Sequence, residues 1–248
     1  MSELVRAELL KVRTTRGWWV YLIAIVLLVG LAVAGDIGSN ADTRGLQEFQ
    51  VGLIESAGFG AVLSVILGIT MVTTEFRHGT VTPTFLAAPS RERVLGSKAI
   101  AGSLVFLLFG VLALLVVAAV ALPWLSIVGD DIHLFDGEVG TRAAQTLLSA
   151  VLWGLMGVAI GSVVHSQVAA LVGTLVWIFL GETLIWGLLG LIDLDGAAGY
   201  LPFRALDAAD GTGGDDLLGY WPGVAVSLGW IAALGAAGMV RTHRRDIT

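Results

Sequence analysis

Long uninterrupted runs of apolar residues alternate with short polar segments along the whole chain. Each run is close to the roughly 20 residues that an α-helix needs to cross a hydrocarbon layer of about 30 Å. The runs lack the alternation expected of membrane barrel strands, and a water-soluble core does not need runs of this length. The pattern predicts an all-α polytopic membrane protein with a single transmembrane domain over residues 1–248. Six transmembrane helices are expected at about residues 18–35, 51–73, 99–122, 146–164, 168–192 and 221–240.

Composition supports the same class. Apolar residues make up 56% of the chain and charged residues only 14%, whereas ordinary globular chains carry about a quarter charged residues. The chain has no cysteine, which excludes disulfides, thiol nucleophiles and thiolate metal sites. Its four histidines are scattered, so no metal site is predicted.

The distribution of Lys and Arg predicts the orientation. Eleven of them lie in the N-terminal segment, the connection between spans two and three, and the C-terminal tail, and only three lie in the other connections. Because positive residues accumulate on the cytoplasmic side of a membrane, both termini are expected in the cytoplasm. The net charge of −6 reflects acidic residues gathered in the outer connections, and no clustered basic element indicates nucleic-acid binding.

The first 16 residues have the pattern of a helix lying on the membrane surface. Met1, Val5, Leu9 and Val12 share one side of a helical wheel, and charged residues occupy much of the rest. A charged flank that only assists insertion is the alternative. Residues 32–34 resemble a signal-peptidase site, but the long basic segment and the length of the following run favour a first span that is not cleaved after Ala34.

The connection between spans two and three is predicted to form a short, kinked elbow, residues 74–91. Gly79 can supply the left-handed residue that ends a helix, and Pro83 and Pro89 prevent one continuous helix. Ser90 is placed to cap the next helix. An elbow with charged ends and an apolar middle can dock into a groove on a soluble partner, and a surface loop that satisfies its own caps is an equal alternative.

The same segment resembles a known family. The string Glu75-Phe76-Arg77-His78-Gly79-Thr80, followed by Thr84, Leu86, Pro89 and Arg91, is similar to the corresponding loop of type-2 ATP-binding-cassette (ABC) transporter permeases, especially short bacterial ones. The segment 8–16 with Trp18 and Trp19 looks like the N-terminal segment of that family. In the family this loop carries the coupling helix that contacts the ATPase subunit. The resemblance therefore implies an ATPase-docking surface formed by Glu75, Phe76, Arg77, His78, Gly79, Thr80, Thr84, Pro89 and Arg91.

The resemblance also implies a function and partners. The chain would be the membrane-spanning permease subunit of an ABC exporter in a bacterial plasma membrane. Two permease copies, identical or paralogous, would work with two ATPase chains. It contains no Gly-x-x-x-x-Gly-Lys-Ser/Thr string, so ATP and Mg²⁺ would be bound by the partner and no cofactor by this chain. We expect no enzymatic activity of its own. Apolar spans favour a lipophilic or amphipathic substrate. The alternative is a membrane anchor or immunity-type protein that binds a target without transporting anything.

Glu55 and Glu182 are the ionisable residues expected within spans. Charge in hydrocarbon is costly, so such residues usually face other helices or water. Both are candidates for a substrate path, although Glu55 can simply reach the interface and Glu182 can be a packed residue bonded to its neighbours.

Three further segments carry expectations. Gly154, Gly157 and Gly161 form a small-residue strip that allows close helix packing, within the chain rather than with a second copy. His165, in a very short connection, is expected to be a solvated loop residue. The long connection 193–220 is expected to contain short amphipathic pieces, with a disordered acidic loop as the alternative.

Overall fold

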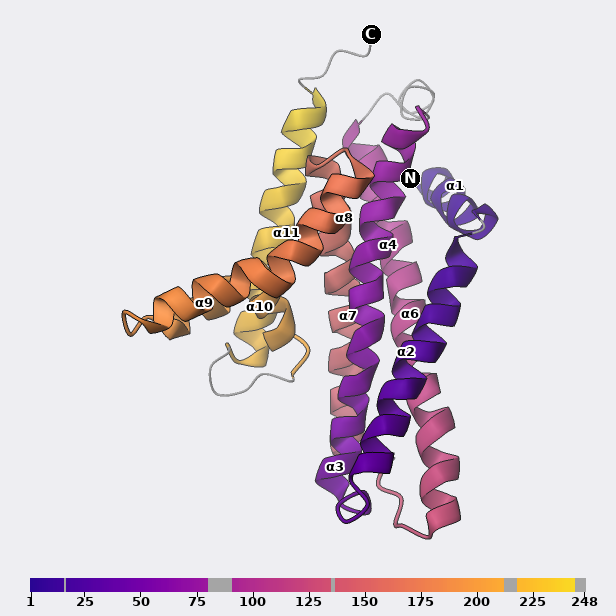
Figure 1. Ribbon diagram of the computed structural model, residues 1–248. Coiled ribbons are helices and arrows are strands. Elements are labelled where there is room, and N and C mark those ends of the chain that lie inside the picture. Colours follow the sequence, from indigo (N-terminus) through magenta and orange to yellow (C-terminus); the bar gives the residue numbers. More distant parts are fainter. Residues whose placement is uncertain (16, 80–90, 135–136, 212–217, 244–248) are drawn as a thin grey trace.

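The computed structural model describes residues 1–15, 17–79, 91–134, 137–211 and 218–243. These residues form an all-helical fold without strands, and six helical segments are long and apolar enough to cross a membrane. The predicted fold class and the number of spans are confirmed. The beginning of α1 and the end of α11 lie at the same end of the bundle (Figure 1), which we call the terminal end.

Five of the six spans are longer than the predicted apolar runs, because helical hydrogen bonding continues into polar residues at their ends. The third span, for example, is expected at 99–122 but extends over 91–128. The fifth, expected at 168–192, ends earlier, at Gly190. The six spans are α2 (Trp18–Ser39), α3–η1–α4 (Gln47–Gly52, Leu53–Ala57, Gly58–Arg77), α6 (Arg91–Val128), α7 (Gly137–Val163), α8–η2–α9 (Gln167–Val176, Trp177–Gly181, Glu182–Gly190) and α11 (Tyr220–His243).

Among the described residues, three elements lie outside the spans: α1 (Ser2–Thr14), the 3₁₀ helix η3 (Asp195–Tyr200) and α10 (Pro202–Ala208). The sequence predicts a helix before the first span, and α1 is that helix, turned away from the axis of α2 (Figure 1). Its predicted apolar residues Val5, Leu9 and Val12 are half-buried, yet the only residue of α1 in the buried class is a glutamate, Glu8.

The centre of the bundle is the contact between α4 and α7, and glycine allows the two backbones to touch. A Cβ on Gly157 would lie 2.2 Å from the carbonyl oxygen of Val65, and one on Gly68 would lie 2.2 Å from that of Gly154. Gly154 also accommodates the ring of Phe106 from α6. The predicted strip Gly154, Gly157 and Gly161 therefore lies against helices of the same chain.

The first span packs through one stripe. Ile25, Val29, Val33 and Ile37 are fully buried at four-residue intervals, against α4 and α6. The other faces of α2 are apolar and exposed, as in a helix that faces lipid.

The fifth span is interrupted by a π-helical turn, η2, between α8 and α9. In Figure 1, α9 runs obliquely outward from the bundle, and α10 lies beside α11 near it. The connection after α9 thus contains the short helical pieces η3 and α10. Residues 212–217, on which part of the alternative prediction of an acidic loop falls, lie outside the described residues.

Candidate functional site

The first five residues of the elbow motif, Glu75–Gly79, lie where α4 reaches the terminal end of the bundle. We call these five residues the elbow base. Glu75 is 9% exposed and points into the protein. One of its carboxylate oxygens accepts hydrogen bonds from Lys11 Nζ (2.7 Å) and Lys98 Nζ (2.6 Å).

Glu8 closes this arrangement from α1. Its two carboxylate oxygens accept one hydrogen bond each, from Lys11 (2.6 Å) and Lys98 (2.8 Å). Glu8, Lys11, Glu75 and Lys98 therefore form a charge cluster without net charge that joins α1, α4 and α6. Burial opposes the charge on Lys11, but hydrogen bonds and charges from Glu75 and Glu8 outweigh burial and raise its pKa above the usual value.

The other residues of the elbow base reach the turn between α7 and α8. The ring of Phe76 packs against His165, with 4.0 Å between ring centroids, and Arg77 donates a hydrogen bond to Gln167 Oε1 (3.3 Å). The interpretation of His165 as a solvated loop residue is therefore wrong, because aromatic packing half-buries it. Gly79 has φ +68°, which confirms the left-handed conformation predicted for it.

The residues predicted to dock an ATPase thus differ in their surroundings. Glu75 faces the interior, whereas Arg77 and His78 are exposed at the end of α4. Arg91 is the first residue of α6. The remaining predicted residues, Thr80, Thr84 and Pro89, lie outside the described residues, and docking itself stays a prediction.

The predicted substrate-path residues lie on different spans, Glu55 on the second and Glu182 on the fifth. Glu182 begins α9 and is 3% exposed. Its carboxylate accepts hydrogen bonds from Trp177 Nε1 (3.0 Å) and from the backbone N–H groups of Phe203 and Arg204 (both 2.8 Å). The alternative expectation is a packed residue bonded to its neighbours. Glu182 is packed and hydrogen-bonded, but two of its three partners, Phe203 and Arg204, lie 21 and 22 residues away in the sequence.

The two bonds from Phe203 and Arg204 hold the fifth span to the start of α10, whereas the bond from Trp177 lies within that span. The π-helical turn brings Trp177 back over Gly181, where a Cβ would meet the indole at 2.9 Å. Arg204 adds a contact in which its guanidinium lies 4.9 Å from the Trp186 ring centroid. A role of Glu182 in a substrate path stays a prediction, and so does that of Glu55, which is exposed in η1 at the opposite end of the second span.

Comparison with known proteins decides the family. A family model described as ABC-2 family transporter protein matches residues 4–186, which is most of the chain. The chain belongs to the ABC-2 transporter family. Searching the curated proteins gives no match. ABC-2 permeases are multi-pass membrane components of transporters and generally work with an ABC ATPase. The matched range contains α1, the elbow base and Glu182, and η3, α10 and α11 follow it.

Sequence reasoning about this ABC-2 chain missed the charge cluster. The sequence suggests only that Glu8 and Lys11 belong to a hydrophilic flank, because their partners in the spans lie 90 and 64 residues away. A glutamate at the end of an apolar span and a lysine at the start of the next were the available signals. Among the described residues, no group of His, Asp or Glu side chains is arranged to hold a metal ion.

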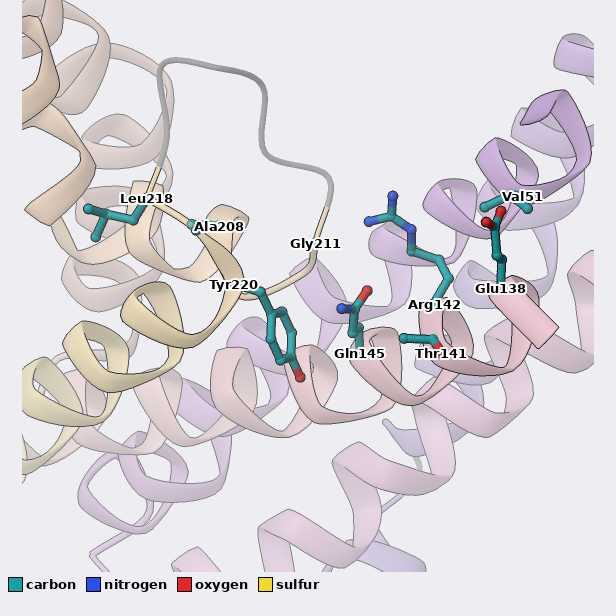
Figure 2. A pocket seen from close by; sticks show the side chains of 10 residues that line it. Val51, Glu138, Thr141, Arg142, Gln145, Ala208, Gly211, Leu218 and Tyr220 are labelled. Atoms are coloured by element: carbon teal, nitrogen blue, oxygen red, sulfur yellow. The ribbon is translucent and has the colours of Figure 1, made fainter.

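At the end opposite the termini, the ABC-2 chain has a cavity of about 390 Å³ between α7 and the residues after α10. Figure 2 shows Arg142 and Gln145 reaching from α7 towards Gly211. Gly211, at φ +76°, leaves space for both side chains, because a Cβ would lie 2.7 Å from Arg142 Nη1 and 2.5 Å from Gln145 Oε1.

Asp210 precedes this glycine and is buried against Gly58. Burial raises the pKa of Asp210 to about 6, the charge of Glu55 adds to the rise, and Ser149 and Arg142 oppose it. A carboxyl group in this position is tolerated most easily in its neutral form.

Proposed function

We propose that this ABC-2 chain is the permease subunit of an ATP-driven exporter and that its elbow base receives the motion of a separate ATPase. The observation that supports this most directly is the connectivity of the elbow base. Within five residues it bonds to α1 through Lys11, to α6 through Lys98, and to the α7–α8 turn through His165 and Gln167. A displacement of the elbow would therefore reach most of the terminal end at once.

The terminal end faces the cytoplasm of a bacterial cell in this proposal, since it carries the larger share of Lys and Arg. Exposed Arg77 and His78 would be presented to the ATPase, while Glu75 transmits force inward through the charge cluster. The division between an exposed side and an ion-paired side is what a mechanical coupling requires.

The partner ATPase would bind ATP and Mg²⁺, because this chain contains no phosphate-binding loop. ATP can drive the spans from one arrangement to another only by binding the ATPase more tightly in one of them. Two permease copies and two ATPase chains would form the working unit, and a lipophilic or amphipathic substrate would leave outward. Exposed apolar helices with few polar residues support that substrate class.

Affinity purification of the full chain in mild detergent tests the partnership. We expect a soluble protein with ATPase activity to co-purify, and the double variant Arg77→Glu/Gly79→Val to lose it. Arg77 and Gly79 are exposed, and valine is strained at φ +68°. The matched control is Arg241→Glu/Gly235→Val, at exposed or open positions of α11.

Retention of the ATPase by the elbow variant would contradict the proposed docking surface. If no ATPase co-purifies with either the native chain or the control variant, the alternative of a membrane anchor or immunity-type protein replaces the permease proposal. With the ATPase bound, stimulation of ATP hydrolysis by lipophilic compounds, and their uptake into inside-out vesicles, would test export.

A further inference from the structure

A second cavity, of about 610 Å³, lies beside the charge cluster between α1, the start of α2 and α4. Its volume is within the roughly 300–1,000 Å³ of typical small-molecule sites. Along α4 it extends from Leu67 to His78, which is about 16 Å at the helical rise. Trp18 and Tyr21, residues of the kind that settle at membrane interfaces, line it as well.

The lining from α4 contains a polar and an apolar stripe, and the polar stripe extends further towards the terminal end. Thr70, Thr74 and His78 follow one another at four-residue spacing and form a polar stripe. Leu67 and Met71 form an apolar stripe beside it. A ligand that fits both stripes has a hydrogen-bonding head near the terminal end and an apolar tail towards the membrane interior.

The polar end is built from buried charged groups. Glu8 and Glu75 line it and are 5% and 9% exposed. Lys11, which also lines the cavity, keeps almost half of its side chain exposed. Lys98, which is not part of the lining, donates hydrogen bonds to both carboxylates. The cavity thus offers an ammonium group and carboxylates side by side, without a surplus of either sign in the cluster.

We propose that this cavity binds one phospholipid with a zwitterionic headgroup from the leaflet next to the termini. Lys11 and the threonine hydroxyls face the phosphate, the carboxylates of Glu8 and Glu75 face the headgroup ammonium, and an acyl chain lies along Leu67 and Met71. An anionic headgroup gains no net attraction from a neutral cluster. The site lies within a single permease chain, and the inference does not depend on the ATPase partnership.

Native mass spectrometry of the full-length chain tests this inference. The chain is taken from nanodiscs with equal parts of phosphatidylethanolamine and phosphatidylglycerol. We expect one phosphatidylethanolamine to be retained in preference to phosphatidylglycerol. Met71→Trp fills the cavity and should lower that retention at least fivefold. The control Leu104→Trp, at a lipid-exposed position of α6, should retain the lipid.

A second variant covers the case in which Met71→Trp does not fold. Thr70→Val/Thr74→Val keeps the side-chain volumes nearly unchanged and removes the hydroxyls, so it should also lose the lipid while its unfolding temperature stays near that of the native chain. A photoactivatable phosphatidylethanolamine should crosslink to residues of α1 and α4.

Three outcomes of the lipid-binding and crosslinking experiments would overturn the proposal, and a fourth concerns detergent. The three are equal retention by the native chain and the cavity variants, preferential retention of phosphatidylglycerol, and crosslinks confined to the exposed faces of α2 or α9. Retention of detergent alone counts against it in the same way, because it shows an apolar pocket without headgroup recognition.

Discussion

Lys98 is the least exposed of the four ionised side chains in the charge cluster, with 4% of its side chain accessible. Placing an ammonium group there is costly unless it is fully paired. Glu8 and Glu75 provide that pairing from two different helices. The value of Lys98 therefore lies in neutralising two buried carboxylates, and the cluster holds α1 against the spans only while it is complete.

Replacing Lys98 with methionine should destabilise the chain by about 3–5 kcal/mol, because the carboxylates of Glu8 and Glu75 would then share only Lys11. The measurement is the thermal unfolding temperature in detergent. The exposed Arg93→Met on the same helix should change little. Adding Glu8→Gln to Lys98→Met should recover part of the loss, and an unchanged unfolding temperature in Lys98→Met would show that the cluster is not formed.

Asp210 should make stability depend on pH. Its pKa is about 6 in the fold against 3.8 for an unburied aspartate, so the native state binds the proton more tightly than the unfolded state. The contribution of Asp210 to the free energy of unfolding is therefore highest near pH 4 and falls as the pH rises to about 6. It stays lower at higher pH. The charged groups that act on it are Glu55, Asp207, Arg142 and, when ionised, Tyr220.

At pH 7.5 the free energy of unfolding of the variant Asp210→Asn should thus exceed that of the native chain by an amount on the order of 1–3 kcal/mol. The variant should therefore unfold at a higher temperature. The difference should vanish towards pH 4. Asp42→Asn, at an exposed position, serves as the control. A difference that is the same at both pH values would argue against a titrating Asp210.

At the scale of elements, α7 is the helix around which the bundle is assembled, because its glycines admit the backbone of α4. Gly157→Ala should destabilise the fold by about 3 kcal/mol, since a Cβ 2.2 Å from a backbone carbonyl can be relieved only by moving a helix. Gly173→Ala, where the added Cβ meets nothing within 4 Å, should be neutral. Thermal unfolding and the yield of monodisperse protein report both.

The contact between Glu182 and α10 is a second contact between elements that can be tested. A glutamine has one acceptor oxygen and an added donor, so Glu182→Gln cannot accept from Phe203, Arg204 and Trp177 together. We expect hydrogen exchange at the amides of Phe203 and Arg204 to become about tenfold faster or more, since hydrogen bonds to a charged group contribute about 1.5–3 kcal/mol. The exposed Glu55→Gln should leave both amides unchanged. Unaltered exchange would show that the carboxylate does not hold α10.

The elements could be predicted from the sequence more fully than their contacts. Long apolar runs identify the spans because a bilayer imposes a minimum length, and a left-handed Gly79 follows from local chemistry. The pairing of Glu8 with Lys98, or of Glu182 with Phe203, depends on where whole helices lie, and no local pattern encodes that. The π-helical turn was missed for the same reason, because Trp177–Gly181 reads as ordinary apolar helix.

For the molecule as a whole, orientation is the property on which the proposed function depends. The chain has no cysteine, so a single introduced thiol reports its own side of the membrane. With a membrane-impermeant maleimide added to intact cells, Asp42→Cys should be labelled and Ser2→Cys should react only after permeabilisation. The reverse result would place the elbow outside the cell and remove the proposed ATPase contact.

The π-helical turn also links chain length to the attachment of the fifth span. Such turns accommodate one extra residue in an otherwise α-helical path. Deleting one residue within Trp177–Gly181 would restore regular winding and rotate everything after it by about 100°. The Glu182 carboxylate would then point away from α10, although every apolar residue needed for crossing the bilayer would still be present. A chain with this deletion would therefore have to secure α10 by a different contact.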